Sequence, residues 1–252
     1  MSSTAYPPSV VYPLSVRGFF DQPSRALWLI KWLLLIPHYI ILAFLWIAFW
    51  VVTVIAFFAI LFTTRYPRGL FDFNVGVIRW SWRVSFYGYT ALGTDRYPPF
   101  TLADVPDYPA RLDLEYPEQL NRWLPLIKWL LALPQYILVG ALVGSGYVVA
   151  ISVQDDGRAV TYSTPSLIGA CVLIGAIAML FTTRYPPGLF DFAVGINRWG
   201  NRLLVYLALM TDRYPPFRLD QGGDDPPGPV GTPEWPAEPA AAEPAGARPP
   251  TQ

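Results

Sequence analysis

The stretch LFTTRYPRGLFDF, residues 61–73, recurs as LFTTRYPPGLFDF at residues 180–192, with twelve of its thirteen letters unchanged. The copies differ only where Arg68 is replaced by Pro187, and each directly follows a long apolar run. This position predicts that the threonines end a membrane span and that the arginine and tyrosine anchor at the interface. Proline and glycine then stop the helix and permit a sharp turn into the next one. The chain therefore builds one arrangement twice.

Two further landmarks recur in the same order, which indicates a tandem duplication. They are LIKWLLLIPHYI at 29–40 with LIKWLLALPQYI at 126–137, and TDRYPPF at both 94–100 and 211–217. We place the copies at residues 12–103 and 108–219. A Pro-, Ala- and Gly-rich acidic tail follows at residues 220–252, and its composition predicts disorder.

The composition is that of a membrane protein. Hydrophobic residues make up 53% of the chain and charged residues 14%, against roughly 45–50% and about 25% in an ordinary soluble domain. Leu33 to Thr64 contains no charged residue, and only His38 is unfavourable in a bilayer. The N-terminus lacks the pattern of a cleavable signal peptide. The single cysteine, Cys171, lies in an apolar run and is predicted to be a buried structural residue.

The net charge of zero conceals an asymmetry between body and tail. Residues 220–252 contain six acidic residues and one arginine, which leaves 17 basic and 12 acidic residues, a net charge of +5, in residues 1–219. A basic body beside a bilayer predicts anionic lipid headgroups as partners in preference to nucleic acid.

The copies differ in length within their apolar regions. The second holds 22 extra residues, including the polar loop VQDDGRAVTYSTP at 153–165, which divides two spans and predicts a membrane hairpin. Residues 27–64 of the first copy have no polar break, so one long crossing and a tight hairpin both fit. The hairpin places 16 of the 17 basic residues on one side and only Arg158 opposite. We therefore predict two hairpins in a multi-pass protein of the bacterial plasma membrane, with both termini in the cytoplasm.

Each hairpin is followed by a segment that begins polar and basic and becomes apolar. Residues 74–93 place Arg79 and Arg83 four positions apart, and residues 193–210 place two asparagines and two arginines on one helical face. Lying in the interface avoids the cost of about 2.5–3.5 kcal/mol for each arginine at the bilayer centre. The predicted fold is thus an all-α membrane protein. It contains two tandem repeats, each a transmembrane hairpin followed by an interfacial amphipathic helix, with short cytoplasmic strands at YPLSVRG, PFTLAD, YPARLDLEYP and PFRLD.

The candidate site residues are charged and repeated. A network of arginines and aspartates near the interface fits either lipid-headgroup binding or structural ion pairing: Arg65, Asp72, Arg79 and Arg83 in the first copy, and Arg184, Asp191, Arg198 and Arg202 in the second. Lys31 and Lys128 are either functional intramembrane charges or residues that snorkel to the interface. His38 is replaced by Gln135 in the second copy, which disfavours a proton relay. No catalytic set, metal cluster or cofactor motif is recognised, so neither an enzyme nor a metal or cofactor site is expected.

The segments IKWLLLIPHYI, LFTTRYPRGLFDFNVGVIRWSWR and TDRYPPF resemble domain of unknown function 4389, a family of bacterial membrane proteins common in actinobacteria. The resemblance covers most of residues 12–219 and implies a membrane protein without assigning site residues. The leading hypothesis is a non-enzymatic protein that organises the membrane or scaffolds partners at its cytoplasmic face, binding anionic headgroups. The alternatives are a small oligomeric transporter or channel, and an accessory subunit of another membrane protein.

Overall fold

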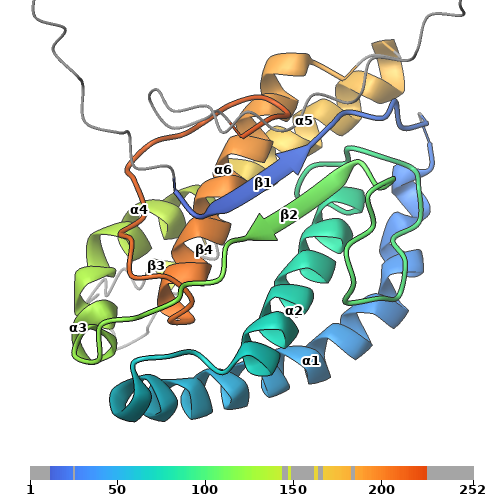
Figure 1. Cartoon of the computed structure of the whole chain (residues 1–252). Coiled ribbons are helices and arrows are strands. Elements are labelled where there is room, and N and C mark those ends of the chain that lie inside the picture. The colour runs from blue at the N-terminus through green and yellow to red at the C-terminus, as the bar shows by residue number, and fades with distance from the viewer. Residues whose placement is uncertain are drawn as a thin grey trace, which may run out of the picture. The chain divides into compact units, whose positions relative to one another are not determined.

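The computed structural model describes residues 12–24, 26–143, 147–148, 162–163, 167–182 and 185–225. They belong to one compact unit, Tyr12–Pro226; the second unit, Met1–Val11 with Pro227–Gln252, consists of residues outside these ranges. The helices are α1 (Trp28–Thr63), α2 (Arg68–Tyr87), α3 (Leu124–Leu131), α4 (Leu133–Val143), α5 (Leu167–Thr182) and α6 (Pro187–Leu207). The strands are β1 (Leu14–Gly18), β2 (Ala110–Leu114), β3 (Tyr147–Val148) and β4 (Tyr162–Ser163) (Figure 1).

The main sheet joins the beginnings of the two copies. β1 and β2 are antiparallel, and Val16 lies opposite Leu112, its counterpart 96 positions later. Because equivalent residues of two antiparallel strands lie opposite each other, a local two-fold axis passes between the strands, perpendicular to the sheet. The prediction of short strands is confirmed for YPLSVRG and YPARLDLEYP, which pair across the copies. It is wrong for PFTLAD and PFRLD, which are irregular.

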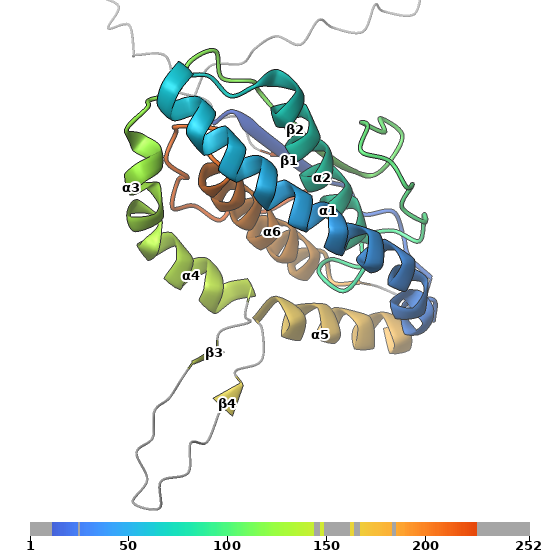
Figure 2. The same cartoon turned by 90° about the horizontal axis from the view of Figure 1, so that it is seen from below.

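The sheet covers a layer made of α2 and α6. Leu14, Val16 and Leu112 are buried, whereas Arg17 and Asp113 on the opposite face are exposed, as expected for a sheet with one packed face. α2 contacts β2 on one side and α1 on the other, and α6 contacts β1 together with α4 and α5. Figures 1 and 2 show these central helices between the sheet and the outer helices.

α1 is one continuous helix, so the hairpin predicted for residues 27–64 is wrong. Its 36 residues extend over about 54 Å at 1.5 Å per residue. The reason lies in the sequence, because AFLWIAFWVVTV contains no glycine, proline or polar cluster that would turn the chain. Pro37 lies within the helix without ending it, and α1 stops at Thr64, whose φ of 59° is left-handed.

The second copy is divided into shorter helices. α3 and α4 are separated by a break at Ala132, before Pro134, and α4 and α5 contact each other. Between them, β3 and β4 form a short antiparallel pair; the predicted polar loop, with Arg158, lies largely outside the described residues. Within the described ranges, α1 alone is long and apolar enough to cross a membrane, judged by its length and composition.

α2 and α6 are buried helices, so their predicted position at the lipid–water interface is wrong. Trp80, Trp82 and Trp199, which belong to these helices, are each less than a tenth exposed. The arginines of both helices turn toward the sheet side instead of snorkelling to lipid, because backbone carbonyls and carboxylates bind them there.

Candidate functional site

Lys31 is buried on the inner side of the first turns of α1. Its ammonium group donates a hydrogen bond to the carbonyl oxygen of Thr94 at 2.6 Å and lies 3.0 Å from an oxygen of Asp95. The ring of Tyr87 lies under the same nitrogen, 4.5 Å from it. The other Asp95 oxygen accepts the backbone N–H of Ser24. Lys31 therefore fastens the TDRYPPF loop to α1.

Lys128 repeats this arrangement in the second copy. Its ammonium group lies 2.8 Å from both the carbonyl oxygen of Thr211 and an oxygen of Asp212, and 5.0 Å from the ring of Tyr206. The backbone N–H of Asn121 donates to the other Asp212 oxygen. Each lysine is thus neutralised by an aspartate and surrounded by protein, which is the arrangement of a structural clamp.

His38 and Gln135 are equivalent in structure as well as in sequence. The indole N–H of Trp80 donates to Nδ1 of His38 at 3.2 Å, and that of Trp199 donates to the Gln135 amide oxygen at 2.6 Å. Both side chains are fully buried. Their shared role is to accept a hydrogen bond from a buried tryptophan, and glutamine does this without an ionisable group.

The arginines of α2 bind the segment around β2. Arg79 donates to the carbonyl oxygen of Leu112 at 2.9 Å and to Asp113 at 3.2 Å. Arg83 is buried and donates to the carbonyl oxygens of Ala103 and Thr101. Burial, together with the charge of Arg79, lowers the pKa of Arg83 to about 10, so it remains charged at neutral pH.

The arginines of α6 bind β1 and the residues that follow the second copy. Arg198 donates to the carbonyl oxygens of Val16, at 2.9 Å, and of Asp220, at 2.5 Å. Arg202 lies 2.7 Å from an oxygen of Asp220 and 2.6 Å from one of Asp225. Residues 220–225 were assigned to the disordered tail, yet they supply these partners. Their composition gave no indication of this role.

The remaining candidates come from the repeated motif. Arg65 is exposed, and no hydrogen bond or ion pair of its side chain occurs within the described part of the chain; Arg184, its counterpart, lies outside it. Asp72 forms an exposed ion pair with Arg68 at 3.3 Å. The structure therefore brings together two pairs of arginines, Arg79 with Arg83 near β2 and Arg198 with Arg202 near β1. Arg65 and Asp72 lie apart from both pairs.

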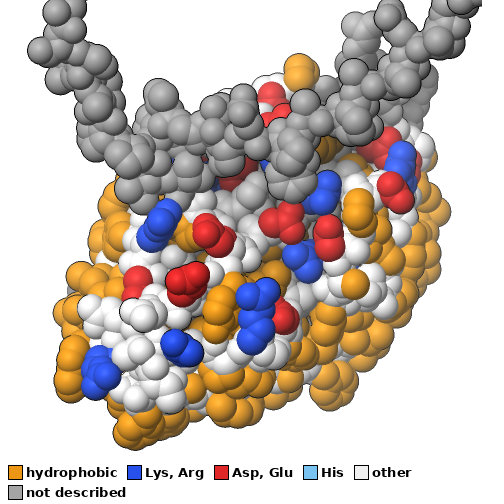
Figure 3. All heavy atoms as spheres, viewed as in Figure 1, with side chains coloured by type: hydrophobic (Ala, Val, Ile, Leu, Met, Phe, Trp, Pro, Cys, Tyr) orange, Lys and Arg blue, Asp and Glu red, His pale blue; other side chains and the backbone are white. Residues whose placement is uncertain are grey.

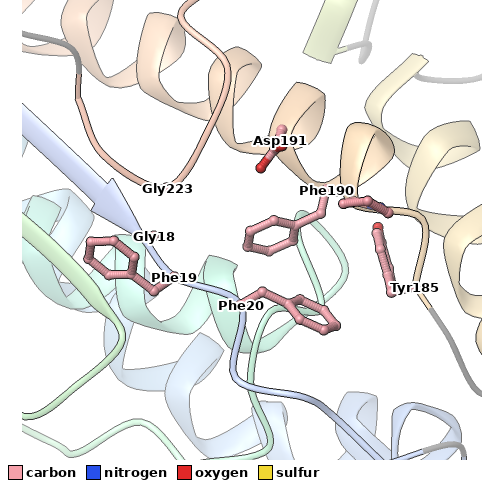
Figure 4. Close-up of a pocket in the computed structure, with 8 residues that line it drawn as sticks. Gly18, Phe19, Phe20, Tyr185, Phe190, Asp191 and Gly223 are labelled. Carbon is pink, nitrogen blue, oxygen red and sulfur yellow. The ribbon is translucent and has the colours of Figure 1, made fainter.

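Asp191 lies beside a cavity of about 210 Å³ at the start of α6. Figure 4 shows the rings of Phe20 and Phe190 next to each other below this carboxylate, with Tyr185 on one side and Phe19 on the other. Sequence reasoning recognised the aspartate but not the aromatic rings around it. Phe20 lies two residues after β1 and more than 160 positions before Asp191 in the sequence.

Charged and apolar side chains separate on the surface. Figure 3 shows charged side chains gathered over the face that carries β1 and β2, whereas hydrophobic side chains cover its lower and lateral margin. Within the described ranges, no group of three or more His, Cys, Asp or Glu residues is placed to hold a metal ion.

Residues 25–101 and 159–218 match the model of a family described as "Domain of unknown function (DUF4389)". No curated protein and no solved structure matches the chain.

Proposed function

Because the chain belongs to the DUF4389 family, with two matching segments that are consistent with tandem copies, we propose a single function to which both copies contribute. The protein is a non-enzymatic component of the bacterial plasma membrane that organises lipid or scaffolds partner proteins. The observation that carries this proposal is the distribution of polar and apolar side chains on α1.

The buried stripe of α1 contains Lys31, His38 and Thr53, whereas its exposed surface consists of large hydrophobic side chains. Phe44 and Ile47, near the middle of the helix, are 69% and 63% exposed. A water-soluble protein places its polar residues outward, and this helix reverses that rule. Apolar surface of this extent is unfavourable in water. In lipid its exposure carries no such free-energy cost, so we infer that lipid surrounds the exposed side of α1.

The two-fold axis between the copies supports a common orientation. The LFTTRYP sequence is identical in both copies, so its two occurrences require the same surroundings. We place the axis along the membrane normal, because equivalent residues then meet the bilayer at the same depth. The charged face that carries β1 and β2 lies toward the cytoplasm in this orientation, where basic residues accumulate. Both ends of α1 then lie on the same side, so α1 is embedded along the bilayer surface and does not cross it.

Two exposed arginines are the best candidates for anionic headgroups. Leu120 donates its backbone N–H to the carbonyl oxygen of Thr64, which fixes the segment carrying Arg122 to the end of α1 near Arg65. Phe62 and Trp123, exposed by 76% and 65%, lie beside these arginines in the sequence and suit a position at the membrane interface. By contrast, Arg79, Arg83, Arg198 and Arg202 are occupied by protein groups.

Labelling of single cysteines tests the orientation. In a Cys171→Ala background, cysteines at Arg17, Arg65 and Arg184 should react with a membrane-impermeant maleimide from the cytoplasmic side only, and one at Phe44 from neither side. Labelling of positions 65 and 184 from opposite sides would refute the common orientation.

Reconstitution tests the function itself. In vesicles of phosphatidylethanolamine and phosphatidylglycerol, the protein should cluster fluorescent phosphatidylglycerol or change vesicle curvature. Arg65→Gln with Arg122→Gln should weaken this effect, whereas Arg96→Gln should not, because Arg96 is paired with Asp21 at 2.9 Å. Unaltered vesicles at high protein loading would contradict the proposal.

The alternative, a small oligomeric transporter or channel, rests on the two buried lysine–aspartate pairs. If these pairs line a path, ion or substrate flux into proteoliposomes should be measurable and should fall in Lys31→Met and Lys128→Met. Absence of flux in the wild-type protein would remove this alternative.

A further inference from the structure

The single difference between the repeated motifs changes the surroundings of one aromatic cluster. In the first copy the ring of Phe71 lies 5.6 Å from that of Tyr66 and 5.0 Å from that of Tyr116, both edge to face. The guanidinium group of Arg68 stacks on Tyr116, 4.5 Å from the ring centre, and pairs with Asp72. The first copy is thus an aromatic site occupied by a cation that the chain itself supplies.

The second copy contains the same cluster without the cation. Phe190 lies 6.1 Å from Tyr185 and 5.1 Å from Phe20, again edge to face. Tyr185 and Phe190 are the counterparts of Tyr66 and Phe71, 119 positions later. Each strand packs on the central helix of the other copy, β2 on α2 and β1 on α6, so Phe20, which follows β1, is the counterpart of Tyr116, which follows β2. Pro187 replaces the arginine, and Asp191 replaces its acidic partner.

Asp191 is left without the partner that its counterpart has. Its half-buried carboxylate forms no hydrogen bond or ion pair with any residue in the described ranges. The cavity beside it is bounded by Phe19, Phe20 and Phe190 and by the backbone at Gly223 (Figure 4). At about 210 Å³ this cavity is smaller than the roughly 300–1,000 Å³ of sites for drug-sized ligands, so it suits a compact group.

We propose that this pocket binds a small organic cation, an alkylammonium or guanidinium group, held by the Asp191 carboxylate and the faces of the surrounding rings. Aromatic faces attract cations of this kind, and a nearby carboxylate adds charge complementarity. The stacked Arg68 shows that the repeated framework accepts such a group. The inference does not depend on the proposed scaffold function, and both a soluble amine and the ammonium headgroup of a lipid carry this chemistry.

The test is binding of tetramethylammonium and guanidinium to the purified full-length protein in detergent, followed by ligand-observed NMR and titration calorimetry. One site should be found in the wild-type protein. Asp191→Asn should weaken binding at least tenfold, whereas Asp72→Asn, the matched change in the first copy, should leave it unchanged. Replacing the cation with a neutral isostere such as tert-butanol should abolish binding.

Exchanging the differing residue between the copies gives the sharpest outcome. Pro187→Arg should supply an internal guanidinium and remove binding, and Arg68→Pro should open a second site and raise the stoichiometry from one to two. Both changes reproduce a residue that the other copy already has at the first position of its helix, where proline is favoured. Circular dichroism and thermal unfolding confirm that each variant is folded.

Two results would overturn the proposal: no binding of either cation at millimolar concentration, or binding that persists in folded Pro187→Arg. The source of the cation is distinguished by comparing soluble phosphoethanolamine with phosphatidylethanolamine in nanodiscs, using Asp191→Asn in both arms. Asp191-dependent binding of the lipid alone identifies a headgroup site, and binding of both identifies a site for free amines as well.

Discussion

Asp225→Asn should destabilise the protein substantially, because Asp225 is a nearly buried partner of two buried arginines. Its carboxylate lies 2.6 Å from Arg202 and 3.6 Å from Arg198, and it accepts the backbone N–H of Val16 at 3.0 Å. Asparagine keeps the size but removes the charge. Breaking a buried ion pair on one side costs about 3–5 kcal/mol. Asp220 and several carbonyl oxygens still bind the arginines, so we expect the lower end, about 3 kcal/mol.

The assay is thermal unfolding of the purified protein in detergent, followed by circular dichroism. A loss of about 3 kcal/mol corresponds to a fall in Tm of roughly 6–12 °C for a chain of this size. The control is Asp72→Asn, which breaks the exposed pair with Arg68 and should cost about 0–1 kcal/mol. Added salt should hardly change the effect of Asp225→Asn, because buried pairs are weakly screened.

A Tm for Asp225→Asn that falls no further than that of Asp72→Asn would refute this reasoning. It would mean that residues 220–225 do not anchor the arginines of α6, and that Arg198 and Arg202 rely on the carbonyl oxygen of β1 and on solvent.

Two further predictions concern buried packing and a buried hydrogen bond, and thermal unfolding measures both. Gly175→Ala should destabilise the protein by about 1–3 kcal/mol, because the added Cβ would lie 2.4 Å from the Tyr185 ring, whereas Gly140→Ala meets nothing within 4 Å and should be neutral or stabilising. An unchanged Tm for Gly175→Ala would contradict this packing. His38→Gln should leave stability nearly unchanged because the second copy already uses glutamine there, while His38→Leu should cost about 1–3 kcal/mol by leaving the Trp80 indole N–H unpaired. Equal losses for both variants would exclude this role for His38.

The duplication and the strands that join its copies could be predicted from sequence, because repeated motifs and alternating hydrophobicity are local patterns. The continuity of α1 could not be decided that way. Hydropathy shows that residues 33–64 are apolar, but it does not distinguish one long helix from two short ones when no turn residue is present. The charge distribution favoured a hairpin, whereas the backbone of α1 continues unbroken.

The partners of the arginines were beyond prediction for a different reason. The spacing of Arg198 and Arg202 correctly placed them on one helical face, and lipid headgroups were among the predicted acceptors. The actual acceptors are Val16 and residues 220–225, at sequence separations that no local pattern records. Similarly, Asp191 was a candidate from the motif. Its aromatic neighbour Phe20 could not be predicted, because it depends on β1 of the first copy packing on α6 of the second.

The attachment of β1 has a consequence for how the chain is made. Leu112 pairs with Val16, Arg198 binds the carbonyl oxygen of Val16, and Asp225 accepts its N–H, 209 positions along the chain. This strand is therefore secured by residues that are made much later than the strand itself. β1 can pair with β2 once residues 110–114 have emerged, but its other edge remains unpaired until residues 198–225 have been made. The N-terminal strand is accordingly fixed in place only after residues near 225 have been made, and a ribosome-bound nascent chain ending near residue 210 should still be open to proteolysis at this strand.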